Sequence, residues 1–156
     1  MLEIKKSDID KFRNDGFLII ENFLFPHHSQ YSWVNNLIRK IREEFSTIDI
    51  LINSAGENHR KPLSESTLDE FDSVMNLNVR APFLLCKEFS KDMMEKKWGR
   101  IINIASSSAH NGFKNAAIYC SSKHALLGLS RTLFVELKDN NVRTFCVSPG
   151  SMKTRM

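Results

Sequence analysis

Residues 48–53 read Ile-Asp-Ile-Leu-Ile-Asn, a run too apolar for a strand with one face in water. Such a run is typical of a central strand in a parallel sheet, because that strand is covered on both faces. Two further strands are predicted, over residues 100–105 and over residues 142–147. Pro149-Gly150 ends the last of these strands.

Predicted helices separate these strands. Apolar residues recur every three or four positions on one helix face between residues 32 and 45: Val34, Leu37, Ile38, Ile41 and Phe45. Thr67, with Glu70 three residues later, is a capping-box pattern that begins another helix. Two longer helices are predicted over residues 79–96 and 117–137. Alternating helices and strands predict an α/β fold, a doubly wound parallel sheet with flanking helices.

Composition excludes several classes of protein. The chain has 156 residues, and its 22 basic and 18 acidic residues are interspersed, which indicates a solvated surface and no nucleic-acid partner. No apolar run reaches the roughly 18 residues of a membrane span, and the charged start shows no secretory signal. Three widely spaced cysteines fit neither a disulfide framework nor a metal site. We therefore expect a cytoplasmic protein with reduced thiols and neither a membrane nor a metal partner.

The first thirty residues differ from the rest. Ser7 can cap a short helix over residues 8–14, Asp15-Gly16 breaks it, and residues 17–20 are a candidate buried strand. Pro26-His27-His28-Ser29 marks a break in the pattern. We therefore predict two parts, an N-terminal segment over residues 1–30 and a domain over residues 31–156.

Tyr119 and Lys123 carry the chemistry that the sequence predicts. They stand one helical turn apart on one face, and an ammonium there favours the phenolate over the phenol. Such a tyrosine can exchange a proton with an alcohol or carbonyl oxygen. Ser106 directly follows a strand, where ligands of open parallel sheets bind, and Asn78 opens the helix beside it. Taken alone the spacing is weak, since many helices contain it by chance and a core tyrosine beside a lysine stem explains it more often.

In combination with neighbouring motifs, residues 32–156 resemble the short-chain dehydrogenase/reductase family. Asn53-Ser54-Ala55-Gly56 resembles the family's Asn-Asn-Ala-Gly element, with Ser54 in place of the second Asn, and Ser148-Pro149-Gly150 ends the third strand. The resemblance implies a partial Rossmann-type fold. It also implies hydride transfer between NAD or NADP and a small-molecule alcohol or carbonyl.

The same resemblance assigns roles to single residues. Tyr119 passes the proton, Ser106 orients the substrate oxygen, Asn78 holds a water, and Lys123 tunes Tyr119 and grips the nicotinamide ribose. These four residues are the predicted catalytic set. The predicted cofactor contacts are Asn53, Ala55, Gly56, Tyr119, Lys123, Pro149, Gly150, Met152 and Thr154.

The glycine-rich loop of that family has no match in this chain. Only 52 residues precede Asn53, and no two of the six glycines lie within ten residues of each other. Such glycines let backbone N–H groups approach the pyrophosphate at a helix N-terminus. We therefore expect the first βαβ unit to be missing, a truncated or chimeric member, and impaired cofactor binding.

Alternatives remain open. Residues 12–24 resemble the start of phytanoyl-CoA dioxygenase-like proteins, but no histidine has the acidic residue two positions later that their iron site needs. A non-catalytic module that forms homo-oligomers through helices 79–96 and 117–137 is a second hypothesis. A serine hydrolase using Ser106 lacks the Gly-x-Ser-x-Gly turn.

Overall fold

The computed structural model describes residues 32–151. The predicted helix over residues 8–14, the strand over 17–20, and Met152 and Thr154 lie outside the described residues, so these stay predictions. The chain divides into two compact units, residues 1–46 and 47–156. In the first unit the described element is helix α2 (Ser32–Glu44), which confirms the helix predicted from residue 32.

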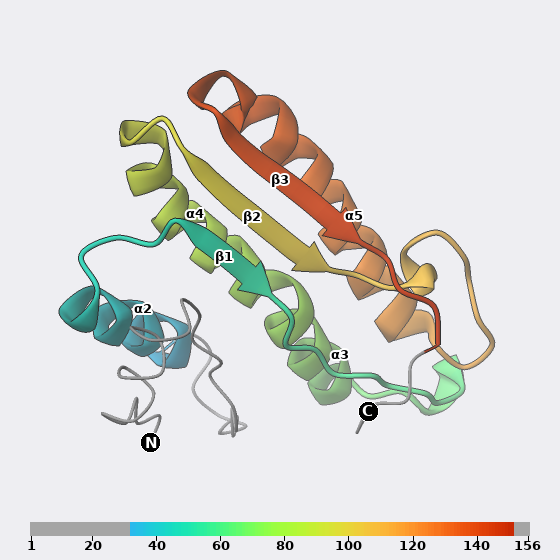
Figure 1. The fold of residues 1–156 in the computed structure, drawn as a ribbon. Helices are drawn as coiled ribbons and strands as arrows, with labels where there is room; N and C mark the ends of the chain where they lie inside the picture. The colour runs from blue at the N-terminus through green and yellow to red at the C-terminus, as the bar shows by residue number, and fades with distance from the viewer. Residues whose placement is uncertain (1–31, 152–156) are drawn as a thin grey trace. The chain divides into compact units, whose positions relative to one another are not determined.

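The second unit contains a parallel three-stranded sheet in the order β1-β2-β3 (Figure 1). Its strands are β1 (Ile50–Asn53), β2 (Gly99–Ile104) and β3 (Val142–Val147). In register, Asn53 pairs with Asn103, which in turn pairs with Cys146. The parallel α/β fold predicted from the alternation of elements is confirmed.

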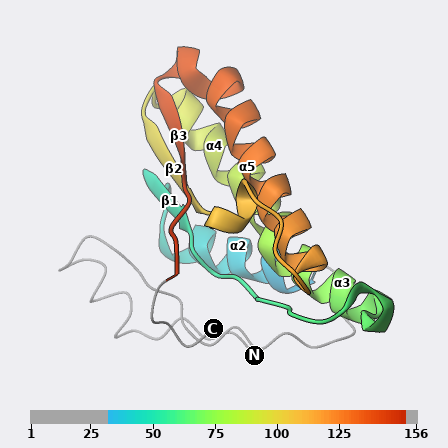
Figure 2. The same ribbon diagram turned by 90° about the vertical axis from the view of Figure 1, so that its right-hand side faces the viewer.

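Helices α4 (Ala81–Glu95) and α5 (Ala117–Leu137) lie on the same face of this sheet (Figure 2). Short 3-10 turns occupy Leu63–Glu65, Ser107–Ala109 and Lys138–Asn140. The core lies between the helices and the sheet, and its largest fully buried side chains include Phe89, Met93 and Ile101. Burial of such side chains stabilises by about 1.5–3 kcal/mol each.

The other face of the sheet carries exposed apolar side chains. On β1, Ile50 is 53% and Ile52 is 56% exposed, and on β3 Phe145 and Val147 are exposed as well. The expectation that residues 48–53 are covered on both faces is therefore not met within residues 47–151. Alternate residues of a strand point to opposite faces, and in β1 it is Leu51 and Asn53 that turn towards the helix-covered face, where Asn53 bonds Cys86 of α4.

Helix α3 (Leu68–Met75) begins at the predicted capping box, with Thr67 and Glu70 bonded reciprocally. It continues through a π-helical segment, Asn76–Arg80, into α4, where we had expected a helix to begin at residue 79. In this segment the N–H of Ala81 donates to the carbonyl of Asn76, five residues back. Such π segments are frequent at functional sites, and this one contains Asn78.

Candidate active site

The segments that follow β2 and β3 are joined by backbone hydrogen bonds. The N–H of Ala105 donates to the carbonyl of Val147 at 2.8 Å, and the N–H of Ser107 donates to the carbonyl of Pro149 at 2.9 Å. This pairing continues past the strands and holds the Ser106 loop beside Pro149. The structure therefore brings together two of the three segments in which sequence analysis placed site residues.

Lys123 is a buried amine at this edge of the sheet. The residue is 2% exposed, and its Nζ donates to the carbonyl of Ile104 at 3.0 Å. Burial lowers the pKa of the Lys123 amine, while the nearby Cys146 acts in the opposite direction. The same Nζ lies 5.7 Å from the centroid of the Tyr119 ring. Helix α5 thus places the tyrosine and the lysine together, as their spacing predicts.

Asn78 is held by three hydrogen bonds and is 0% exposed. Its Oδ1 accepts from the N–H of Glu57 at 2.8 Å, and its Nδ2 donates to the carbonyl of Glu57 at 2.9 Å. Nδ2 also donates to Oγ of Ser122 at 2.9 Å, and that hydroxyl donates to the carbonyl of Tyr119 at 2.8 Å. Asn78 therefore links the segment after β1 to the turn of α5 that carries Tyr119.

Gly56 lies against both of these groups. A Cβ built on it would lie 3.3 Å from Oδ1 of Asn78 and 3.3 Å from Nζ of Lys123. The absence of a side chain at Gly56 therefore leaves room beside the amine and the amide. This contact brings the segment after β1, which is the last of the three predicted segments, to the site.

Ser106 caps the 3-10 turn that follows β2. Its Oγ accepts from the N–H of Ser108 at 3.1 Å, and among the described residues its hydroxyl donates to no acceptor. Ser106 and Tyr119 are both partly exposed. The Ser106 hydroxyl proton is therefore left for a bound molecule.

The predicted cofactor contacts differ in their surroundings. Ala55 and Gly150 are exposed, and Pro149 is half-buried. Asn53 is buried, and its Nδ2 donates to Oδ1 of Asn103 at 2.8 Å and to Sγ of Cys86 at 3.4 Å. Its side chain therefore points into the core, which leaves its backbone for any contact with a ligand.

Sequence analysis missed two residues that support the site, Ser122 and Asn103. Ser122 lies three residues after Tyr119 and directly before Lys123, and this spacing indicates that it shares their helix turn. Asn103 interrupts the apolar strand β2 and is fully buried, with its Nδ2 donating to Oγ of Ser130 at 2.9 Å. A polar residue inside an apolar strand predicts a buried hydrogen-bond partner.

This fold and this edge of the sheet define an α/β protein with a buried lysine beside a partly exposed tyrosine, beyond the carboxyl ends of parallel strands. The short chain dehydrogenase family matches residues 23–156, and the chain belongs to that family. It is 35% identical to D-threitol dehydrogenase of Mycolicibacterium smegmatis over 116 residues, which are 74% of this chain and 45% of that protein.

Solved structures agree with this assignment. A 4-hydroxyisoleucine dehydrogenase complexed with NADH has a TM-score of 0.77 and 35% identity, over 84% of this chain and 58% of the other. ElxO with NADP bound has a TM-score of 0.74 and 30% identity, over 85% of this chain and 54% of the other. The chain spans about half the length of the curated relatives it matches.

Membrane-spanning helices and metal centres are both absent from residues 32–151. No helix there has the length and apolar content that crossing a membrane requires. No group of three or more His, Cys, Asp or Glu side chains in that range is placed to hold a metal ion.

Proposed function

We propose that this chain carries the proton-transfer site of an NAD(P)-dependent oxidoreductase that interconverts small alcohols and carbonyls. One observation carries the proposal. A lysine amine that is almost fully buried lies beside a partly exposed tyrosine, at the sheet edge where the loops after β2 and β3 are paired. Burying an amine is costly, and perturbed ionisable groups of this kind gather at functional sites.

The residues present fit a nicotinamide cofactor. An ammonium has three N–H donors, and among the described residues Nζ of Lys123 has one acceptor, the carbonyl of Ile104. Two donors remain for ribose hydroxyls, and Gly56 leaves the adjoining space free of a side chain. The relatives with solved structures include one complexed with NADH and one with NADP bound. When bound, the nicotinamide would accept or supply the hydride.

The chain's own residues would handle the proton. Tyr119 would exchange a proton with the substrate oxygen, and the positive charge of Lys123 would favour the phenolate in that exchange. Ser106 would donate its free O–H to the same oxygen. Asn78 would keep the turn of α5 that carries Tyr119 at a constant position, through Ser122.

The test compares Tyr119→Phe with Ser121→Ala, a change at an exposed neighbour on the same helix turn. Turnover of polyols and of ketones by the 156-residue chain is followed with NAD(H) and NADP(H) at high cofactor concentration. General acid–base catalysis contributes about 10²–10⁴-fold, so Tyr119→Phe should lose at least about a hundredfold in kcat. Equal rates for the two variants, or no turnover by the unaltered chain, would overturn the proposal.

We further infer that this chain by itself binds the cofactor weakly. No glycine-rich loop occurs in its sequence, so the backbone donors that normally hold the pyrophosphate are missing. Hydrogen bonds to charged groups contribute about 1.5–3 kcal/mol each, so losing several of them costs orders of magnitude in affinity. Isothermal titration with NADH and NADPH measures this, and a low-micromolar Kd for either would contradict the inference.

A second candidate function is self-association through α4 and α5. Phe83 on α4 is exposed, and Gly128 on α5 is exposed with open space where a side chain would be. A bare glycine lets another helix approach closely, and an exposed phenylalanine supplies apolar contact. Sedimentation velocity at several concentrations distinguishes a monomer from an oligomer. A monomer at every concentration would rule out this candidate function.

A further inference from the structure

The chain enters α5 through a tight turn over residues 113–116. The N–H of Ala116 donates to the carbonyl of Phe113 at 3.2 Å, which closes the turn. Asn115 is the third residue of this turn and has a φ of 60°. Turns with a positive φ at the third position favour glycine or asparagine there, because other side chains clash with the backbone. Asn115 therefore has the backbone conformation that turns the chain into α5.

Asn115 makes its contacts through the backbone and not through its side chain. The side chain is exposed, and its amide has no hydrogen-bond partner within residues 32–151. The carbonyl of Asn115 accepts from the N–H of Lys61 at 2.7 Å. Lys61 belongs to the segment after β1, so this bond joins that segment to the residue just before Ala116, the N-cap of α5.

Lys61 is itself held at the start of α3. Its Nζ donates to Oε1 of Glu70 at 2.9 Å, and Oε2 of the same carboxylate accepts from the N–H of Thr67 at 2.8 Å in the capping box. The starts of α3 and α5 are therefore connected by a short series of hydrogen bonds that ends at the carbonyl of Asn115.

The first turn of α5 has no side-chain cap. Its N-cap is Ala116, and no acidic residue lies in the first turn, whereas α3 begins with a complete capping box. The first N–H groups of a helix have no partner within the helix, so a helix without a cap opens most easily at its start. Tyr119 is the third residue of α5 and lies in this uncapped turn.

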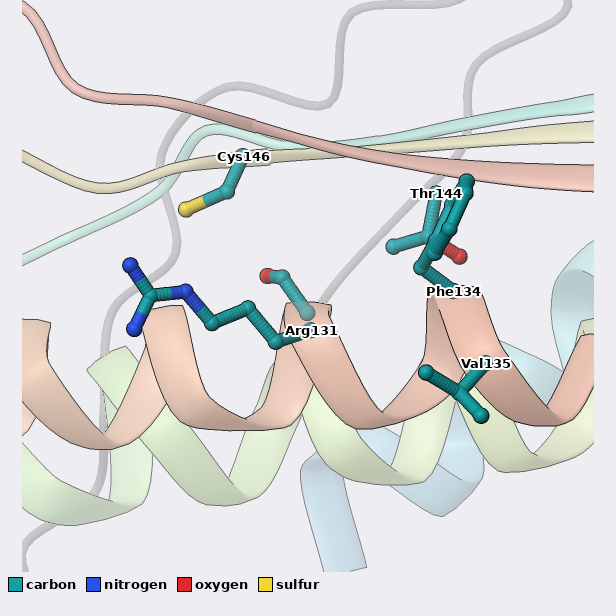
Figure 3. Close-up of a pocket in the computed structure, with 6 residues that line it drawn as sticks. Arg131, Phe134, Val135, Thr144 and Cys146 are labelled. Carbon is teal, nitrogen blue, oxygen red and sulfur yellow. The ribbon is translucent and has the colours of Figure 1, made fainter.

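Farther along, side-chain packing holds α5 against the sheet. Leu126 is buried, and Figure 3 shows Phe134 of α5 next to Thr144 of β3 in the groove between these two elements. Lys123, one turn after Tyr119, is buried and donates to the carbonyl of Ile104. Opening of the first turn would therefore move Tyr119 away from Lys123, whose position the rest of the helix fixes.

We propose that Asn115 is a positioning residue, which holds the first turn of α5 closed and so keeps Tyr119 beside Lys123. The left-handed backbone of Asn115 sets the direction in which α5 begins, and its carbonyl joins this start to the segment after β1. The proposal rests on the proposed function for the role of Tyr119, and it assigns Asn115 no contact with substrate or cofactor.

Amide hydrogen exchange of the 156-residue chain tests the proposal without any turnover. The N–H of Cys120 donates to the carbonyl of Ala116 at 2.8 Å, so its exchange reports opening of the first turn. Asn115→Val should speed this exchange by about tenfold, because a left-handed backbone is unfavourable for a β-branched residue. Asn115→Gly should stay within about twofold of the unaltered chain, since glycine adopts a positive φ freely. Should Asn115→Val not fold, Asn115→Ala replaces it.

Asn141→Val is the matched control. Asn141 is also exposed and left-handed, with a φ of 57°, but it lies beyond the other end of α5. This variant places the same unfavourable conformation elsewhere, so the exchange of Cys120 should stay within about twofold of the unaltered chain. Equal exchange at Cys120 in Asn115→Val and Asn141→Val would show that Asn115 has a general structural role only, and this would overturn the proposal.

Turnover supplies a second readout. A misplacement of about 1 Å can cost about a hundredfold in rate, so Asn115→Val should lower kcat at least about tenfold and leave KM for the ketone nearly unchanged. Asn115→Gly should keep the unaltered kcat. An unaltered kcat in Asn115→Val would overturn the link to Tyr119. If the unaltered chain has no turnover, the proposed function fails, while the exchange comparison still decides whether Asn115 holds the first turn of α5.

Discussion

Replacing Asn78 by alanine should destabilise the chain by about 2–4 kcal/mol. The side chain is fully buried and makes three hydrogen bonds, two with the backbone of Glu57 and one with Ser122. A hydrogen bond contributes about 0.5–1.5 kcal/mol net, and a buried group left without its partner costs about 1–3 kcal/mol. Because the partners are only partly buried, water can replace some of these bonds, which sets the lower end of the range.

Urea unfolding with linear extrapolation measures this loss. Asn76→Ala is the matched control, since Asn76 lies in the same π-helical segment but is only half-buried. Changes at such positions usually stay within about 0.5 kcal/mol. Ser122→Ala should cost about 1 kcal/mol, and the double variant with Asn78→Ala should cost less than the sum, because the two residues share a hydrogen bond.

The result that would refute this reasoning is equal stability of the Asn78→Ala and Asn76→Ala variants. It would mean that the contact between Glu57 and Asn78 does not hold the segment after β1 in solution. Strict additivity of Asn78→Ala and Ser122→Ala would refute the link to α5 alone. The two outcomes are separable because the contact with Glu57 includes Oδ1 of Asn78, whereas the contact with Ser122 uses Nδ2 alone.

Two other predictions concern stability at acid pH and the face of the sheet that carries exposed apolar side chains. A hydrogen bond from Lys61 is the main reason that the pKa of Glu70 is lowered from 4.5 to about 2. The stability that this carboxylate contributes is complete above pH 4.5 and is lost as the pH falls towards 2. In Glu70→Gln, the unfolding free energy measured by urea unfolding should therefore depend less on pH between 4.5 and 2. Ile52→Thr should change stability by less than about 1 kcal/mol, whereas Ile101→Ala, fully buried, should cost about 2–5 kcal/mol by urea unfolding.

Local signals predicted several elements to within a residue or two. The α5 helix and the β3 strand have the predicted bounds, and α3 begins at the predicted capping box. The cap is formed by atoms of residues 67 and 70, so the pattern needs no information from elsewhere in the chain. Helix periodicity likewise depends on neighbours three and four positions away, which is why it can be recognised in a single sequence.

The π-helical segment could not be predicted in this way. Residues 76–80 have ordinary helical composition, and the wider turn places Asn78 where its amide meets a backbone 21 residues earlier. The inward direction of Asn53 has a similar origin. Its partner Asn103 is 50 residues away, and register within the sheet decides that the two amides meet. Sequence spacing contains no signal for either contact.

The amino-acid sequence by itself determined the order of helices and strands, the place of Tyr119 and Lys123 on one helix turn, and the family to which they point. Each of these depends on residues that are near neighbours along the chain. Tertiary structure alone decided that the lysine amine is buried against Ile104, that Gly56 adjoins it, and that the carbonyl of Asn115 meets the N–H of Lys61. Those facts depend on how the sheet and helices pack, because burial and hydrogen-bond partners come from groups distant in sequence.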